Sequence, residues 1–272
     1  MLGVKYTKGF LDALFGQEMH AARVESLANG VVGVLAAAVV SVAAIGKAYA
    51  LVAGIKGKSG IKQIDRLLSN SGVVVEHIQK EWAAFVVGAR KEIVLAMDWT
   101  EFDDDDHSTL CAYMVTSHGR ATPLVWHTVT KSELRGKRTQ IEHDMVERLH
   151  GWLEPDIEVE LLADRGFGDQ KLYELLMFYG WDFTIRFRGN IRVENANGEA
   201  RSANDWVLPT GRAFMIRNAR VTDDRAAVPA VVVVHAKGMK EPWCMVTSRK
   251  DFTASQVTKR YARRFSIEET WS

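Results

Sequence analysis

The chain has few cysteines and no metal-binding histidine motif. Only two of its 272 residues are cysteines, Cys111 and Cys244, and they form no Cys-x-x-Cys pair. This argues against a zinc ribbon or a disulfide scaffold and predicts a reduced, cytoplasmic setting. The histidines lack ligand spacings such as His-Glu-x-x-His, so a helical zinc site is not indicated either.

The sequence also lacks an excess of charge of one sign. The formal net charge is +1, with 47% hydrophobic and 25% charged residues, which is typical of a soluble globular protein of one or two domains. The charges are nevertheless segregated along the chain, and local basic stretches are characteristic of nucleic-acid binding. One basic stretch contains Lys47, Lys56, Lys58, Lys62 and Arg66, and the other contains Lys259, Arg260, Arg263 and Arg264.

No apolar run reaches the length that a membrane span prefers. The segment of residues 30–46 has no charge, but it has only roughly 17 residues and is rich in Ala and Gly, whereas a span needs about 20 strongly apolar residues. The segment is not preceded by a basic amino terminus with a cleavage site, so it is a poor signal peptide. A buried helix is favoured, and a membrane-associated protein built on residues 30–55 is the weaker alternative.

The first ninety residues have helical periodicity. Apolar residues recur at helix spacing around Leu11 and again around Ile64, and glycines between residues 30 and 60 are expected to separate short helices. Residues 45–68 resemble a helix, a glycine turn and a second helix on which Lys62 and Arg66 lie one turn apart. Such a helix could lie against DNA phosphates, or the two side chains could form an ordinary solvated face.

The pattern changes near residue 91. Strands are predicted at 92–98, 109–117, 122–129, 157–163 and 182–188, with helices at 138–152 and 169–179. This order resembles a ribonuclease-H-like α/β core, in which a five-stranded mixed sheet begins with an antiparallel meander. The predicted organisation is a helical DNA-binding region (1–90), the first part of the core (91–189), a β-rich insertion (190–250) and a final core helix (251–272), capped by Asp251 or Thr253.

Three carboxylates carry the predicted chemistry. Asp98 and Asp164 each end an apolar strand, where ligands commonly bind, and Glu268 lies on the late helix. Each aspartate has a plainer alternative as a loop or turn residue. Together the three acids can converge on a pair of divalent metal ions, which would clamp the attacking and leaving oxygens of a phosphoryl transfer.

The late helix carries the spacing Tyr-x-x-Arg-x-x-x-Glu. Tyr261, Arg264 and Glu268 are three and four residues apart, so a helix places them on one face. A metal-binding acid, a phosphate-binding arginine and a hydrogen-bonding phenol on one face form a chemically sensible set. The plainer alternative is an amphipathic helix with an arginine–glutamate ion pair.

These motifs resemble a known family. The segments Asp98-Trp99-Thr100, Asp164-Arg165-Gly166-Phe167-Gly168 and Tyr261-x-x-Arg264-x-x-x-Glu268 are similar to the DDE transposases of the bacterial insertion-sequence-four family, over about residues 40–272. The resemblance implies that Asp98, Asp164 and Glu268 hold two Mg²⁺ ions, which Mn²⁺ could replace. It further implies that Tyr261 and Arg264 contact phosphates, that the N-terminal helices recognise terminal inverted repeats, and that a homodimer acts on paired double-stranded DNA ends.

A tryptophan extends the resemblance. Family members that excise through a DNA hairpin carry a Trp in a W-x-x-x-T strand, and Trp243 with Thr247 matches that pattern. The resemblance implies that Trp243 stacks on a flipped base, for which an indole face is well suited. A buried core tryptophan is the alternative. Arg186 and Arg188 end the fifth predicted strand and could hold backbone phosphates, or serve surface solubility.

The chain departs from the family pattern at its end. The pattern has a lysine seven positions beyond the glutamate, whereas this sequence stops at Ser272, four residues past Glu268. The expectation is therefore a C-terminally truncated member. Two functions remain open: a cut-and-paste transposase, and a truncated remnant that binds transposon-end DNA without cutting it.

Overall fold

The structure is a computed structural model that describes residues 4–116 and 120–267. It separates into two compact units, Met1–Phe85 and Val86–Ser272.

The first unit is helical in its described part. Buried side chains of the first two helices, including Leu11, Phe15 and Val24, form its core together with Ile78 of the fifth. The helices are α1 (Val4–Phe15), α2 (Ala21–Ala37), α3 (Val42–Ala53), α4 (Gly57–Leu68) and α5 (Val75–Val87), the last of which continues two residues into the second unit.

The sequence predicted that the glycines between residues 30 and 60 separate short helices, but some of them lie inside helices. Gly30 and Gly33 lie inside α2, and Gly46 lies inside α3. A Cβ added to Gly46 would lie 2.4 Å from the Cα of Ile61, and one added to Gly60 would lie 2.1 Å from the carbonyl oxygen of Gly46. These glycines therefore allow the α3 and α4 backbones to touch, which a periodicity argument does not anticipate.

The segment considered for a membrane span forms two helices. Within the described residues no single helix is long and apolar enough to cross a bilayer, and α2 and α3 meet that test only together, across a bend of 98°.

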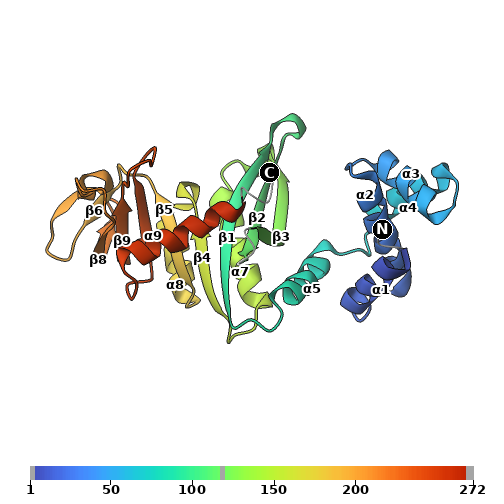
Figure 1. Cartoon of the computed structure of the whole chain (residues 1–272), viewed down its shortest axis with the longest axis horizontal. Coiled ribbons are helices and arrows are strands. Elements are labelled where there is room, and N and C mark those ends of the chain that lie inside the picture. Colours follow the sequence, from blue (N-terminus) through green and yellow to red (C-terminus); the bar gives the residue numbers. More distant parts are fainter. Residues whose placement is uncertain (1–3, 117–119, 268–272) are drawn as a thin grey trace. The chain divides into compact units, whose positions relative to one another are not determined.

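The second unit is built on one mixed sheet (Figure 1). Its order among the described residues is β3-β2-β1-β4-β5-β10-β9-β8-β6-β7. The strands are β1 (Glu92–Phe102), β2 (His107–Val115), β3 (Ala121–Thr130), β4 (Glu158–Ala163), β5 (Asp182–Phe187), β6 (Arg192–Glu194), β7 (Ala200–Ser202), β8 (Phe214–Val221), β9 (Ala226–Val234) and β10 (Trp243–Thr247).

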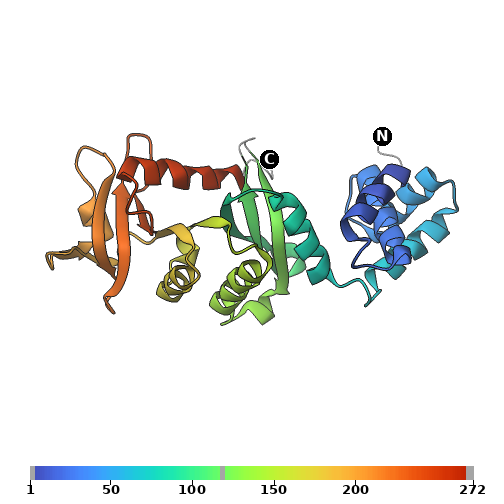
Figure 2. The same cartoon turned by 90° about the horizontal axis from the view of Figure 1, so that it is seen from below.

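The first five strands have ribonuclease-H-like topology. β1, β2 and β3 form an antiparallel meander, while β4 runs parallel to both β1 and β5. The crossovers place α7 (Arg138–Trp152) and α8 (Gln170–Phe178) on one face of the sheet, opposite α9 (Ala254–Ala262), as Figure 2 shows. The short helix α6 (Lys131–Leu134) follows β3. This confirms the predicted α/β core.

The predicted insertion does not form a separate sheet. β10 pairs antiparallel with β5, so the insertion strands continue the core sheet. Two short strands, β6 and β7, were not predicted, because three-residue strands are too short to show alternation.

The last helix joins the insertion to the core. Thr253 rather than Asp251 caps α9, through a capping box with Gln256. Val257 and Tyr261 of α9 pack on Val232, Val234 and Met245 of the insertion strands. From Arg263 the α-helix tightens into the 3₁₀-helix η4 (Arg263–Ile267), whose last residue packs on the core strands. The prediction of a continuous α-helix beyond Arg263 is therefore wrong.

Candidate active site

Asp98 and Asp164 lie side by side at one edge of the sheet. β1 and β4 are neighbouring parallel strands, and Met97 is paired in register with Ala163. Each aspartate is the next residue along the chain, and adjacent strands are about 4.8 Å apart. Asp164 follows the last residue of β4, but β1 continues to Phe102, so the predicted strand end at Asp98 is wrong. Strand register thus brings together two of the three acids, 66 residues apart in the sequence.

Both acids project from the sheet face that α9 and η4 cover. Side chains two residues apart share a face, so Asp98 follows Val94 and Ala96 on β1. Those two residues belong to a buried cluster with Leu162 of β4 and Ile267 of η4. The C-terminal segment formed by α9 and η4 (Ala254–Ile267), called the tail below, therefore packs on the face that carries the acids.

The side chain of Asp98 is 29% exposed and lies between the backbone and an arginine. Its Oδ1 accepts a hydrogen bond of 3.1 Å from the backbone N–H of Trp99, and its Oδ2 lies 3.9 Å from Nη1 of Arg264. Its charge also contributes to raising the pKa of the neighbouring Cys111 thiol to about 12, although burial is the main cause.

Asp164 is held by the turn that follows it. Its Oδ1 accepts a 2.7 Å hydrogen bond from the backbone N–H of Gly166, which caps the 3₁₀-helix η2 (Arg165–Phe167). A Cβ on Gly166 would approach this same oxygen to 3.0 Å. The Asp-Arg-Gly motif therefore fixes the orientation of the carboxylate while leaving the side chain half-buried.

The predicted third acid, Glu268, lies outside the described residues. Its assignment as a ligand stays a prediction. Within residues 4–116 and 120–267, no group of three or more His, Cys, Asp or Glu side chains could hold a metal ion.

Tyr261 and Arg264 lie inside the tail rather than on its surface. Tyr261 is 1% exposed and Arg264 is 7% exposed. Burial raises the pKa of the Tyr261 phenol, against the lowering effect of the Arg264 and Arg186 guanidinium groups. Little surface of either residue is available to a phosphate in this conformation, so their predicted DNA contacts stay predictions.

Trp243 forms an aromatic cluster with the tail. Its ring stacks on Phe265 at 5.6 Å between centroids and meets Tyr261 edge-on at 5.2 Å. The indole is half-buried at the end of β10 and borders the core formed by the insertion and α9. The structure thus brings Trp243 to the tail motif, but its predicted stacking on a flipped base is not tested.

The two arginines at the carboxyl end of β5, Arg186 on the strand and Arg188 just after it, differ in environment. The side chain of Arg186 is 14% exposed and lies 2.9 Å from the carboxylate of Glu241, whereas Arg188, just beyond the strand, is exposed. Lys62 and Arg66 are exposed on α4 of the other unit. Their roles in DNA binding stay predictions.

The sequence analysis did not predict the contacts that Trp99, the residue after Asp98, makes with α7. On the opposite face of the sheet, the indole N–H of Trp99 donates a 2.7 Å hydrogen bond to Glu142 of α7. Arg138 lies 3.4 Å from the same carboxylate and 5.0 Å above the Trp99 ring. Burial raises the pKa of Glu142 to about 7, against the lowering effects of the Trp99 hydrogen bond and Arg138. No sequence signal marks Glu142, because its partner is 43 positions away.

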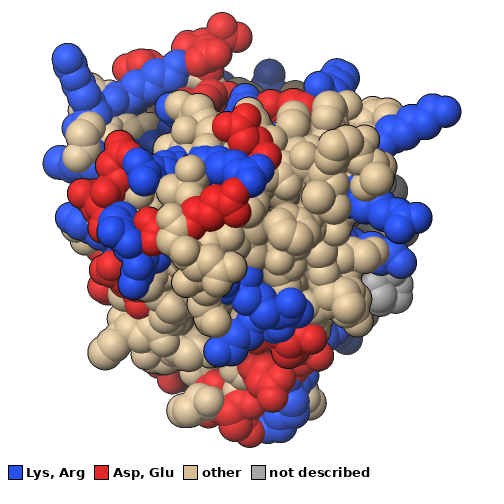
Figure 3. Space-filling view, turned by 90° about the vertical axis from the view of Figure 1, so that its left-hand side faces the viewer, with Lys and Arg blue, Asp and Glu red and all other residues tan. Residues whose placement is uncertain are grey.

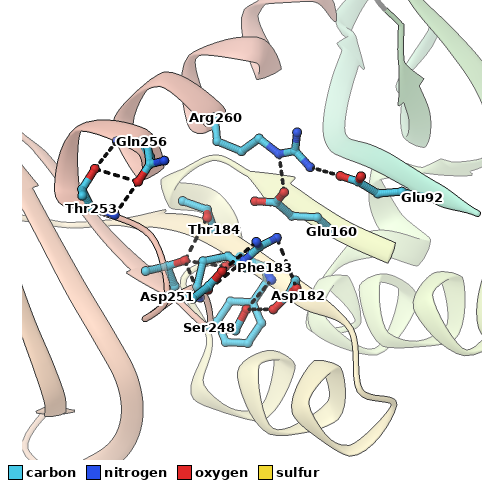
Figure 4. A network of polar contacts seen from close by, with 12 residues as sticks. Glu92, Glu160, Asp182, Phe183, Thr184, Ser248, Asp251, Thr253, Gln256 and Arg260 are labelled. Carbon is cyan, nitrogen blue, oxygen red and sulfur yellow. Dashed lines mark hydrogen bonds and ion pairs between the residues drawn. The ribbon is translucent and has the colours of Figure 1, made fainter. Parts of the chain in front are cut away.

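A second arginine ties the tail to the sheet. Arg260 bonds to both Glu160 of β4 and Glu92 of β1, at the amino ends of these strands (Figure 4). Burial raises the pKa of Glu160, while Arg260 opposes the shift. Arg260 therefore anchors α9 at acids that lie about 13 and 20 Å along the strands from Asp98, at roughly 3.3 Å per residue.

The donors present fit a hard divalent cation. Two half-buried aspartates just beyond the last β1–β4 register pair offer carboxylate oxygens, and Mg²⁺ is commonly bound by one or two carboxylates with water completing its shell. Their backbone hydrogen bonds orient them without adding nitrogen or sulfur ligands.

Residues 89–272 match the family described as transposase DDE domain. The chain belongs to this family. DDE transposases generally use divalent metals and act on DNA by phosphoryl transfer, which agrees with the two paired aspartates. No curated protein sequence matches the chain.

Solved structures with similar folds are distant in sequence. Argonaute of Marinitoga piezophila, in complex with a guide RNA, is 12% identical over 72% of this chain and 31% of its own, with a TM-score of 0.27. Endonuclease V of Ciona intestinalis, in complex with a 24mer DNA that contains an inosine, is 13% identical over 68% of this chain and 85% of its own, with a TM-score of 0.32. This chain thus spans about a third of the Argonaute chain.

Proposed function

We propose that the protein is a cut-and-paste DNA transposase of the insertion-sequence-four type, which cleaves and joins strands at insertion-sequence ends. The observation that carries this proposal is the position of Asp98 and Asp164, each one residue beyond the last register pair of β1 and β4, in a DDE domain. The neighbouring position of Arg264, three residues after Tyr261 in the tail, supports it.

In this proposal Asp98, Asp164 and Glu268 hold two Mg²⁺ ions. Ile267, the residue before Glu268, packs on the sheet face from which both aspartates project, which supports the inclusion of Glu268. When bound, divalent ions stabilise charge on the phosphate and make a water more acidic. The chain's own contribution is to fix the carboxylates, through the N–H groups of Trp99 and Gly166.

The reaction consists of successive displacements at phosphorus. Water attacks the phosphodiester at the transposon end, the bond to the 3′-oxygen breaks, and a 3′-hydroxyl is released. That hydroxyl attacks a phosphodiester of the opposite strand, the bond to the 3′-oxygen of the flanking DNA breaks, and the transposon end is left as a hairpin. A second water reopens the hairpin, and the restored 3′-hydroxyl attacks a target phosphodiester, from which a target 3′-hydroxyl leaves. Trp243 would stack on a flipped base of the hairpin, using ring surface that Phe265 does not cover.

DNA recognition is proposed to involve both units. Lys62 and Arg66 on α4 would contact phosphates of the inverted repeat, since both are exposed. Arg186 and Arg188 would contact the strand near the site. Tyr261 and Arg264 would act on phosphates only after the tail rearranges, and two copies would hold the paired ends.

The test is metal-dependent cleavage of a labelled duplex that carries the DNA flanking the gene. Strand cleavage in Mg²⁺ or Mn²⁺, but not in EDTA, is expected, with products ending in a 3′-hydroxyl or a hairpin. Binding of the duplex without cleavage in either metal would contradict the proposal and favour the alternative of a DNA-binding remnant.

A further inference from the structure

A carboxylate of the insertion lies between two arginines of the catalytic core. Glu241, in the turn before β10, is 2.9 Å from Nη2 of Arg186 and 3.2 Å from Nη1 of Arg165. Arg165 directly follows Asp164, and Arg186 lies on β5, the strand next to β4. The insertion therefore places an acid on two basic groups beside a predicted metal ligand.

The Arg186 guanidinium also contacts the residue that follows Glu241. Its Nη2 also donates a 3.1 Å hydrogen bond to the carbonyl oxygen of Pro242, and its side chain is 14% exposed. Its Nε is buried and has no hydrogen-bond partner among the described residues. Arg186 and Asp164 both act electrostatically on the buried phenol of Tyr261, so both are near that residue.

Two guanidinium groups that converge on one carboxylate offer the geometry that a phosphate requires. Arginine donors match the oxygens of carboxylates and phosphates alike. Glu241 and Arg165 are half-exposed, with side-chain exposures of 50% and 55%. Exposed ion pairs contribute little to stability, so a competing anion can replace the carboxylate at small cost.

Basic and acidic side chains are mixed on the surface at this end of the unit. Figure 3 shows Lys and Arg side chains interspersed with Asp and Glu over much of the face that carries the insertion strands. Attraction of DNA near the site would thus depend on individual arginines and on the acids that neutralise them.

We propose that Arg165 and Arg186 form a binding site for a DNA backbone phosphate beside the scissile bond, and that Glu241 occupies this site in the free protein. The inference rests on the proposed function, because DNA is taken as the ligand. Binding exchanges the carboxylate for a phosphate and releases the turn that leads into Trp243. Glu241 thereby weakens the binding of DNA, because a backbone phosphate must displace it from the two arginines.

The test is the affinity of Glu241→Gln for a fluorescein-labelled duplex of mixed sequence and about 30 base pairs, measured by fluorescence anisotropy in EDTA at several salt concentrations. The variant is expected to bind roughly three- to tenfold more tightly than the wild type. Glu199→Gln is the matched control, because it removes the same charge from a half-exposed pair with Arg201 elsewhere in the insertion.

Arg165→Met tests the arginine side of the site. In the Glu241→Gln background it should abolish the gain in affinity and lower the slope of log K against log salt by about one. Arg165 and Glu241 are both half-exposed, so these variants are expected to fold, which thermal unfolding would verify.

Equal affinities of Glu241→Gln and Glu199→Gln would overturn the proposal. Weaker binding by Glu241→Gln would also overturn it, since the carboxylate would then support the site, as would a lack of duplex binding by wild type and variant at the lowest salt. Failure of the proposed function is distinguishable, because it appears as normal binding without cleavage in Mg²⁺ or Mn²⁺.

Discussion

Acidic side chains and arginines lie near each other at both ends of the β1–β4 strand pair, but their contacts differ between the two ends. At the amino ends, Glu92 and Glu160 are both bonded to Arg260. At the carboxyl ends, Asp98 and Asp164 follow the same register, but the contact from Arg264 to Asp98 is 3.9 Å long. Arg260 and Arg264 are one helical turn apart in the same tail.

This difference shows why two acids on neighbouring strands are not sufficient for a metal site. The Glu160 side chain is 3% exposed and its charge is matched by Arg260, so it serves to attach the tail. The Asp98 side chain is 29% exposed and is oriented by a backbone N–H. At the carboxyl ends the carboxylate is therefore oriented and accessible to a ligand, whereas at the amino ends Glu160 is buried and its charge is neutralised by Arg260.

The largest effect is expected at the carboxyl ends. Asp98→Asn or Asp164→Asn should lower strand cleavage at least about a thousandfold, because a lost metal ligand removes several kcal/mol of charge stabilisation and each 1.36 kcal/mol is tenfold in rate. Duplex binding should be retained. Glu92→Gln, on the same strand as Asp98, is the control and should leave cleavage within a few-fold of wild type. Near-normal cleavage by either asparagine variant would refute the assignment.

The next largest effect is expected at the amino ends. Arg260→Met leaves the buried Glu160 without its partner and should lower the free energy of unfolding by about 3–5 kcal/mol. Urea denaturation measures this. Lys91→Met removes a cation from an exposed pair with Asp156, with side-chain exposures of 72% and 62%, and should cost less than about 1 kcal/mol. Equal losses in the two variants would show that burial of Glu160 does not matter.

A third prediction concerns the support of β1 on the opposite face. Burial raises the pKa of Glu142 to about 7, so the folded state binds this proton more tightly than the unfolded state. The resulting stabilisation is present below the unfolded pKa of about 4.3 and is lost as pH rises through about 7. Relative to Glu142→Gln, the wild type should lose up to about 3 kcal/mol between these pH values.

The measurement is urea denaturation of both proteins at several pH values between about 4 and 8, which span the two pKa values. The Glu142→Gln variant keeps a side-chain oxygen that can accept the Trp99 indole hydrogen bond, so the difference isolates the charge. A constant difference in unfolding free energy across this range would contradict the raised pKa.

The smallest effect is expected at the start of the tail. Thr253→Ala removes the cap of α9, where the threonine oxygen accepts from the backbone N–H of Gln256 at 3.3 Å. The loss should be about 1 kcal/mol in thermal or urea unfolding, since the cap is exposed. A loss as large as that of Arg260→Met would mean that the cap, rather than the Arg260 ion pairs, anchors the tail.

Much of the core could be predicted because its signals are local. The apolar run before Asp164 correctly predicted a strand end, whereas the run before Asp98 marked only the end of the β1–β4 pairing, because β1 continues to Phe102 against β2. The spacing of Tyr261 and Arg264 predicted their proximity on one helical face. The partners of Glu160 and Glu142 could not be predicted, because they lie 100 and 43 positions away and depend on how helices pack across the sheet. The depth of Tyr261 was also missed, since a helical pattern does not specify which neighbour covers it.

The sequence by itself determined the order of the core helices and strands and the family, because these depend on residue type and spacing along the chain. Tertiary structure alone decided that the insertion extends the core sheet, that Arg260 neutralises one pair of acids, and that Glu241 lies between Arg165 and Arg186. The physical reason is that ion pairs and burial depend on distances in space between residues remote in sequence, which strand register and helix packing determine.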